Sequence, residues 1–210
     1  MEYMRPAEIE KRSFEIIDGE LAEKGIRLTG ETAPVIRRCI HTTADLEYAE
    51  SMVFSEDAIR KLKELIRGGA DIVTDTNMAL SGINKKEFSR YGGSISCHMA
   101  DEDVAREAQE RGVTRASVSM EKAMSSGRRT VFVSGNAPTA LITLWEHHES
   151  GSYSPVFVIG VPVGFVNVVE AKELIIKSGI PHIVNRGRKG GSNVAAAIVN
   201  AVLYMMRDEV

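Results

Sequence analysis

Short apolar runs that alternate with longer helical segments are the feature that most constrains how this chain folds. Each run is almost continuously apolar or β-branched, which is typical of strands in a parallel sheet with both faces buried. The predicted strands are residues 71–74, 94–97, 130–133, 156–159 and 182–184.

The intervening segments carry helix-forming residues with apolar side chains three and four positions apart. They are residues 55–68, 101–111, 137–150, 168–178 and 192–206. Four of the five end at a glycine, as helices often do. Strands that alternate with helices predict a single α/β domain over residues 1–210, with a doubly wound, mostly parallel sheet and helices on both faces.

Charge and composition argue against several classes of protein. The formal net charge is −3, which disfavours a nucleic-acid module with its basic face. No run approaches the roughly 20 apolar residues that a bilayer requires. Charges are scattered through residues 1–17, where a signal peptide has an apolar core, so we expect a cytoplasmic protein with no membrane partner. Cys39 and Cys97 lack the spacing of a zinc site, and no metal is expected.

Ligands of doubly wound sheets bind beyond the carboxyl ends of the strands, so a site is expected in the segments that follow the strands. These segments are residues 75–77, 98–99, 134–138, 160–164 and 185–192. Four of the five are rich in small or polar residues, which let a backbone approach a ligand closely.

Residues 186–192, which read Arg-Gly-Arg-Lys-Gly-Gly-Ser, open the last predicted helix. Helix N-termini attract anions, and Arg186, Arg188 and Lys189 add positive charge, so a carboxylate or phosphate site is expected. The alternative is a glycine-rich turn with solvated charges. The segment matches neither G-x-G-x-x-G nor the P-loop pattern, and no such fingerprint follows the first strand. An NAD-dependent or nucleotide-binding enzyme is therefore not expected.

Other residues of these segments allow two interpretations. Asn136 could cap a helix or offer its amide to a ligand, and Asp75 could serve in the site or cap the turn at 77–83. His98 follows a strand and could line the cleft. His182 begins the last strand and is expected far from the ligand edge.

His41 is the candidate for proton transfer. A helix that begins near Glu31, with Ile36 and Ile40 on one face, would place His41 near its C-terminus. An imidazolium is stabilised there, and a histidine that titrates near neutrality suits general acid–base catalysis. Taken alone, such a histidine is more often structural or solvated.

Seven segments of the chain, taken together, resemble the precorrin-8X methylmutases, including their cobalt-precorrin-8 counterparts. The segments are residues 12–17, 38–41, 75–78, 114–115, 135–141, 160–166 with Glu170 and Lys172, and 186–188 through 190–192. They are distributed over nearly the whole chain, in the expected order and spacing. Each is weak by itself, whereas seven in order are specific.

The resemblance implies an isomerase of cobalamin biosynthesis that moves a methyl group from C11 to C12 of the macrocycle. The product is hydrogenobyrinate on the metal-free route and cobyrinate on the cobalt route, and the sequence leaves the route open. The family's catalytic histidine falls on His41, and its substrate-contacting serine and arginine fall on Ser13 and Arg115. The resemblance also implies a homodimer whose clefts lie at the subunit interface.

The implied partner is an anionic tetrapyrrole (corrinoid), a flat apolar ring edged by carboxylates. The residues expected to bind it are Ser13, Arg115, Asn136, Arg186, Arg188, Gly190, Gly191 and Ser192. The methyl shift is intramolecular, so no cofactor is expected, and the enzyme contributes orientation and electrostatics. The hypothesis is that His41 protonates the conjugated ring. The alternative is a noncatalytic corrinoid carrier, which would leave the chromophore unchanged.

Overall fold

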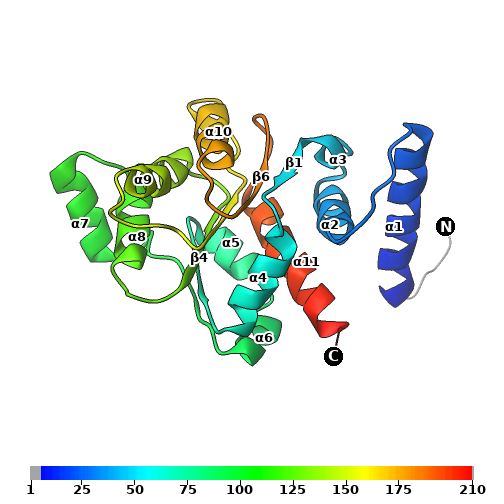
Figure 1. Cartoon of the computed structure of the whole chain (residues 1–210), viewed down its shortest axis with the longest axis horizontal. Coiled ribbons are helices and arrows are strands. Elements are labelled where there is room, and N and C mark those ends of the chain that lie inside the picture. The colour runs from blue at the N-terminus through cyan, green and yellow to red at the C-terminus, as the bar shows by residue number, and fades with distance from the viewer. Residues whose placement is uncertain (1–5, 210) are drawn as a thin grey trace.

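A six-stranded sheet with helices on both faces forms the centre of the protein (Figure 1). The computed structural model describes residues 6–209. The strands are β1 (Met52–Phe54), β2 (Asp71–Thr74), β3 (Ile95–Ser96), β4 (Thr130–Ser134), β5 (Phe157–Gly160) and β6 (His182–Asn185). Their order across the sheet is β1-β6-β5-β4-β2-β3, and every neighbouring pair is parallel except β1 and β6. The predicted fold class is confirmed.

The helices divide between the two faces of the sheet. They are α1 (Pro6–Glu23), α2 (Ala33–Thr43), α3 (Tyr48–Ser51), α4 (Ala58–Arg67), α5 (Asn77–Gly82), α6 (Lys85–Phe88), α7 (Glu102–Arg111), α8 (Arg115–Met124), α9 (Pro138–Glu149), α10 (Val168–Lys177) and α11 (Ser192–Arg207), with a 3-10 turn at Ser89–Tyr91. Helices α2, α4, α5 and α11 pack on one face, and α8, α9 and α10 pack on the other. In β4, Val131 and Val133 face the first core and Phe132 faces the second. Both faces are buried, which explains the continuous apolar runs of the sequence.

The predicted strands are all present, and none of their ends differs from the prediction by more than one residue. The sequence missed β1, which has three residues and pairs antiparallel with β6 through Met52 and Asn185. A strand this short carries no readable period of its own. Its pairing depends on a partner more than 100 residues away in the chain.

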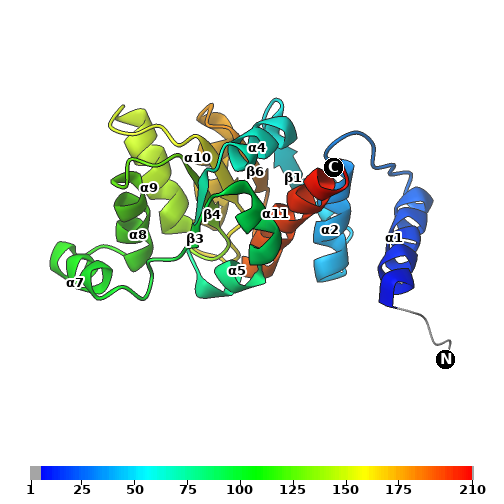
Figure 2. The same cartoon turned by 90° about the horizontal axis from the view of Figure 1, so that it is seen from below.

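Helix α1 lies at one end of the molecule, beside α2 and away from the sheet, as Figures 1 and 2 both show. Ile17 and Leu21 bury their side chains in the core that contains α2. An ion pair of 2.9 Å between Arg37 and Asp18 adds a second contact between the two helices. Ile16, in contrast, is about half exposed, so α1 keeps an apolar side chain open to solvent.

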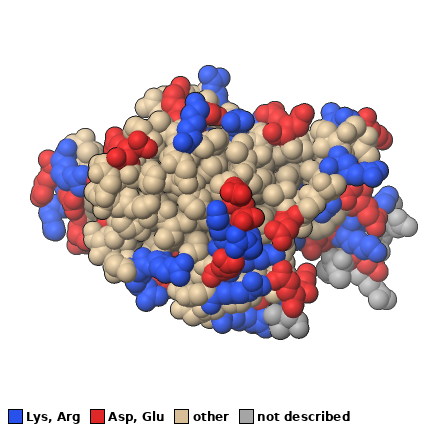
Figure 3. Space-filling view, in the orientation of Figure 1, with Lys and Arg blue, Asp and Glu red and all other residues tan. Residues whose placement is uncertain are grey.

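Positive and negative side chains are mixed over the face of the molecule in Figure 3, and no broad patch of one sign is visible there. That face therefore lacks the basic surface typical of nucleic-acid-binding proteins. Within residues 6–209, no helix combines the length and the hydropathy needed to cross a bilayer.

Phe132→Ala should lower the free energy of unfolding by about 3–5 kcal/mol, because it leaves a cavity in a fully buried core. Phe165→Ala is the matched control, since Phe165 is 84% exposed and its truncation should cost less than about 0.5 kcal/mol. Urea unfolding measures both variants. Equal losses would contradict the packing described here.

Candidate functional site

A buried carboxylate organises the carboxyl edge of the sheet. Asp75 follows β2 and has no exposed surface. Its carboxylate accepts hydrogen bonds from the backbone N–H groups of Gly135 (2.8 Å), Asn136 (2.8 Å) and Ala137 (2.6 Å), and from the hydroxyl of Ser134 (3.0 Å). A single side chain on β2 thus holds the turn that follows β4.

The interpretation of Asp75 as the cap of the turn at 77–83 is wrong. The cap of α5 is Thr76, whose Oγ1 accepts a hydrogen bond of 3.0 Å from the backbone N–H of Ala79. The Asp75 carboxylate instead accepts hydrogen bonds from a segment about 60 residues away in the chain. Nothing in the local sequence distinguishes these two outcomes.

The start of α11 packs directly on this turn. Thr76 Oγ1 and Ser192 Oγ share a hydrogen bond of 2.7 Å. A Cβ atom at Gly135 would lie 2.7 Å from the Cα of Ser192, and one at Gly190 would lie 2.1 Å from the carbonyl oxygen of Val161. Glycine is required at both positions because backbone meets backbone there.

The predicted binding residues at this edge therefore differ in accessibility. Asn136 is exposed, whereas Gly191 and Ser192 are buried. The Ser192 hydroxyl is already bonded to Thr76. The backbone N–H of Gly191 donates to the carbonyl oxygen of Val161 at 2.9 Å, which leaves the backbone N–H of Ser192, at the first position of α11, to meet a ligand.

The cationic loop between β6 and α11 contains Arg186, Arg188 and Lys189, which are all exposed. Arg186 forms an ion pair of 2.9 Å with Glu173. The guanidinium carbon of Arg188 lies 5.6 Å from the centre of the Phe165 ring. Arg188 makes no ion pair with any residue in the described range 6–209, which leaves its charge available to an anion.

Lys189 joins this loop to the segment after α2. Its ammonium lies 2.6 Å from a carboxylate oxygen of Asp45 and 2.7 Å from one of Glu47. The bond to Lys189 holds the pKa of Asp45 below its usual value. The end of α2 is thereby fixed beside the carboxyl edge of the sheet.

His41 and Ser13 meet in a pocket of about 320 Å³ between α1 and α2. The lining residues are Ser13, Ile16, Ile17, Glu20, Ile40, His41, Ala44 and Leu46. His41 is exposed in the last turn of α2, and its ring meets the ring of Phe14 edge-on at 5.4 Å. The Ser13 hydroxyl donates to the carbonyl oxygen of Ile9 at 2.9 Å. Ala44 and Leu46 flank Asp45, so the pocket lies next to the segment bound by Lys189.

Arg115 lies apart from His41 within one chain. It begins α8, which packs on the opposite face of the sheet from α2, and Figures 1 and 2 place the two helices on opposite sides. The hydroxyls of Thr114 and Thr139 share a hydrogen bond of 2.8 Å. This bond ties the start of α8 to the start of α9, so Arg115 belongs with the Asn136 turn.

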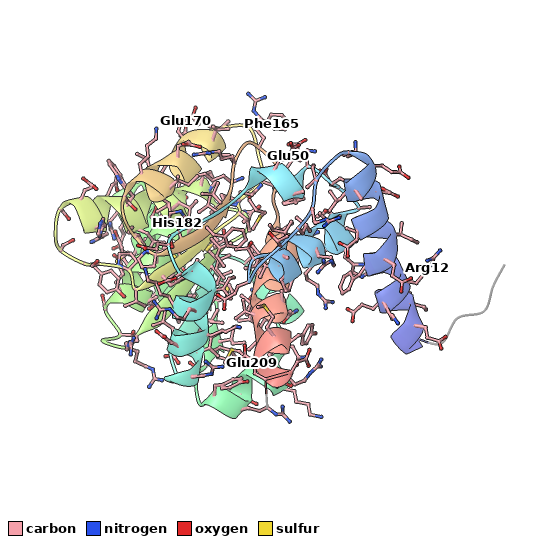
Figure 4. The ribbon with its side chains drawn as sticks, turned by 45° about the vertical axis from the view of Figure 1, so that its right-hand side comes forward. Arg12, Glu50, Phe165, Glu170, His182 and Glu209 are labelled. Atoms are coloured by element: carbon pink, nitrogen blue, oxygen red, sulfur yellow. The ribbon has the colours of Figure 1, made fainter. Side chains whose placement is uncertain are left out.

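Apolar side chains are exposed around the carboxyl edge, and sequence reasoning did not select them. Phe165 is 84% exposed and Val166 is 76% exposed, and Met78 and Val163 are also open to solvent. In Figure 4, Phe165 lies at the same end of the molecule as Glu50 of α3, away from Glu209 near the C-terminus. The available signal was a large apolar residue in a segment that follows a strand.

Lys172 is the other residue that sequence reasoning left without a role. It is fully buried in α10, and its ammonium donates to the carbonyl oxygens of Gly187 (2.9 Å) and Lys189 (2.7 Å). Burial lowers the pKa of Lys172 to about 7, because a low-dielectric interior disfavours the charged form.

His98 and His182 make local contacts. His98 Nδ1 lies 3.0 Å from a carboxylate oxygen of Asp101. His182 is buried in β6 with Nδ1 2.7 Å from the carbonyl oxygen of Ile180, and burial lowers its pKa. Among residues 6–209, no three His, Cys, Asp or Glu side chains form a group that could hold a metal ion.

Comparison with known proteins identifies the family. The model of the precorrin-8X methylmutases (CbiC) matches residues 8–205. The chain belongs to the precorrin-8X methylmutase family. It is 44% identical to the cobalt-precorrin-8 methylmutase of Salmonella typhimurium, over 99% of this chain and all of that protein. It is 34% identical to the precorrin-8X methylmutase of Pseudomonas aeruginosa, over 96% of this chain and 97% of that protein.

The fold agrees with that of a solved methylmutase. The crystal structure of precorrin-8X methylmutase from Thermus thermophilus has a TM-score of 0.85 and 35% identity, and the match covers 96% of this chain and 98% of that chain. As a member of the precorrin-8X methylmutase family, the protein is an isomerase of cobalamin biosynthesis. The alternative of a noncatalytic corrinoid carrier is not favoured.

Asp75→Asn should lower the free energy of unfolding by about 3 kcal/mol, because an NH₂ group would replace a buried acceptor and face backbone N–H donors. Asp57→Asn is the control, since Asp57 is exposed and pairs only with nearby Arg60, and little change is expected. Thermal and urea unfolding provide the comparison. Wild-type stability in Asp75→Asn would mean that the turn after β4 holds itself.

Proposed function

We propose that the protein moves a methyl group from C11 to C12 of cobalt-precorrin-8, giving cobyrinate, with His41 as the residue that transfers the proton. The observation that carries this proposal is the 44% identity over 99% of the chain to a protein named cobalt-precorrin-8 methylmutase. The proteins named precorrin-8X methylmutase are 35%, 34% and 32% identical to this chain, whereas those named cobalt-precorrin-8 methylmutase range from 44% down to 35%. This difference favours the cobalt form of the substrate over the metal-free form.

The surface at the carboxyl edge suits such a ligand. A corrinoid ring is flat and apolar, and exposed Phe165, Val166 and Met78 offer it apolar contacts. Its peripheral carboxylates require donors, which Arg188 and the backbone N–H groups of Gly190 and Ser192 can supply. The proposed binding residues are Ser13, Arg115, Asn136, Arg186, Arg188, Gly190, Gly191 and Ser192.

His41 is suited to hand a proton to the macrocycle. It lies in the last turn of α2, and an imidazole can act as a general acid or a general base. It is exposed to the pocket that Ser13 also lines, so a ring edge can reach it. In the proposed mechanism, His41 protonates the conjugated ring, and the methyl group then migrates from C11 to C12 with its bonding electrons. The ring next loses a proton, which the neutral imidazole of His41 takes back. The isomerisation balances without a cofactor, and the enzyme contributes orientation and electrostatics.

We further propose a homodimer whose site lies at the subunit interface. Within one chain, Arg115 and His41 lie on opposite faces of the sheet. A second copy related by two-fold symmetry would bring Arg115 of one subunit towards His41 of the other. The exposed Ile16 of α1, which borders the His41 pocket, would then be covered.

His41→Ala should reduce turnover of cobalt-precorrin-8 by about 10²–10⁴-fold, the usual contribution of a general acid, and leave binding of the ring intact. His147→Ala is the control, because His147 lies in α9 and contacts Ser152 and Glu121 away from the pocket. Absorption spectra follow conversion to the corrin chromophore. Normal turnover in His41→Ala would refute the role, and spectral binding without conversion by wild type would favour the carrier.

Mixing the variants His41→Ala and Arg115→Ala tests the interface site. Each variant alone should have low activity. After subunit exchange about half of the dimers are mixed, and each mixed dimer holds one intact site of two, so activity should recover to about a quarter of the wild-type value. Light scattering should give twice the mass of the 23.0 kDa chain. A monomer at micromolar concentration, or a mixture no more active than its parts, would contradict a site shared between subunits.

A further inference from the structure

Three consecutive carbonyl groups of the loop after β6 are held by donors from elsewhere in the protein. The ammonium of Lys172 donates to the carbonyl oxygens of Gly187 (2.9 Å) and Lys189 (2.7 Å). Between them, the carbonyl oxygen of Arg188 accepts a hydrogen bond of 3.1 Å from the backbone N–H of Gly164. The loop therefore has all three oxygens engaged with the protein.

The N–H groups of the same peptides point the other way. In a trans peptide the C=O and N–H bonds are antiparallel, and the structure contains no cis peptide among its described residues. Each N–H group therefore points away from the donor that holds the carbonyl of its peptide, and the N–H groups of Arg188, Lys189 and Gly190 donate to no acceptor within residues 6–209. Successive backbone N–H groups that lack an internal acceptor are a common way for a turn to bind an anion.

Burial of Lys172 costs more free energy than a purely structural contact would require. It has no exposed surface, and no carboxylate of the described chain pairs with it, since its polar contacts are the two carbonyl oxygens. A buried cation without a counter-ion is costly, and its lowered pKa of about 7 reflects that cost. An apolar residue could be buried at a lower cost in free energy, but it could not donate hydrogen bonds to the two carbonyl oxygens.

Asn185 assists from the end of β6. It is fully buried, and its Nδ2 donates to the carbonyl oxygen of Lys189 at 2.7 Å. Lys172 Nζ donates to that same oxygen, so two buried side chains hold the Lys189–Gly190 peptide plane in place. This arrangement singles out the Lys189–Gly190 peptide as the most firmly held of the loop.

We propose that Lys172 is a positioning residue that turns the carbonyl groups of Gly187 and Lys189 inward, so that the N–H groups of Arg188, Lys189 and Gly190 bind a carboxylate of the substrate. Lys172 itself does not touch the ligand. The identity of that carboxylate as one on a corrinoid ring rests on the proposed function, whereas the orientation of the loop does not.

Lys172→Met tests the proposal, because methionine is unbranched and of similar length but donates no hydrogen bond. Lys177→Met is the matched control: Lys177 is exposed on the same helix, and its loss should change nothing at the loop. In a crystal structure of free Lys172→Met, the peptide planes that contain the Gly187 and Lys189 carbonyls are expected to turn. The KM for cobalt-precorrin-8 and the Kd for cobyrinate should rise about tenfold, as for one lost charge-assisted contact, with kcat within about twofold.

The outcomes separate this proposal from the function. Unchanged carbonyls in Lys172→Met overturn the positioning role whatever the ligand is. Turned carbonyls with wild-type KM and Kd overturn the link to the carboxylate, as does a fall in kcat alone. If wild type neither binds nor converts the ring, the proposed function and the carboxylate fail together, and the crystal structure still decides whether Lys172 orients the loop. If Lys172→Met does not fold, Asn185→Leu removes the second donor to Lys189 and should raise KM by a smaller factor.

Discussion

The carboxylate of Asp75 is the contact on which the carboxyl edge of the sheet depends. It gathers three backbone N–H groups of the turn after β4 and the hydroxyl of Ser134. That turn presents Gly135 to the start of α11 at a distance that excludes a Cβ atom. The Thr76–Ser192 bond completes the junction. The end of β2, the turn after β4 and the start of α11 can thus meet closely, because a buried acceptor satisfies donors that would otherwise require water.

Two kinds of chemistry are separated in space by this architecture. The carboxyl edge offers cations, outward N–H groups and exposed apolar side chains, which together suit a flat ring with acidic substituents. The pocket between α1 and α2 offers an imidazole and the Ser13 hydroxyl. Lys189 connects the two regions through its ion pairs with Asp45 and Glu47. The carboxyl edge and the pocket therefore adjoin, and none of the residues of the loop after β6 lines the pocket.

Hydrogen-bond satisfaction links the two buried polar groups of the site. Asp75 accepts hydrogen bonds from backbone N–H groups, so the N–H groups of the turn after β4 point inward. Lys172 donates hydrogen bonds to carbonyl oxygens, so the N–H groups of the loop after β6 are left without an internal acceptor. The sign of a buried charge thus determines which side of a peptide faces the ligand. Parallel sheets suit this control, because neighbouring loops emerge at the same edge.

The sequence by itself determined the fold class, the strands of the parallel sheet and the cationic, glycine-rich character of residues 186–192. A strand buried on both faces leaves a continuous apolar run, and an amphipathic helix leaves a period of 3.6 residues, so both can be read from short stretches of sequence. A cluster of Arg, Lys and Gly is visible directly. The family resemblance, carried by seven segments in order, also came from the sequence and was confirmed by the family match.

Only the tertiary structure decided that β1 pairs with β6, that Asp75 serves the turn after β4, that Lys172 is buried beneath the loop, and that Arg115 lies across the sheet from His41. Each of these facts joins residues that are distant in sequence. The free energy of burying a charge, and that of a hydrogen bond between segments, depend on which groups meet in space. A lysine on an amphipathic helix has the same local pattern whether its ammonium ends in water or against two carbonyl oxygens.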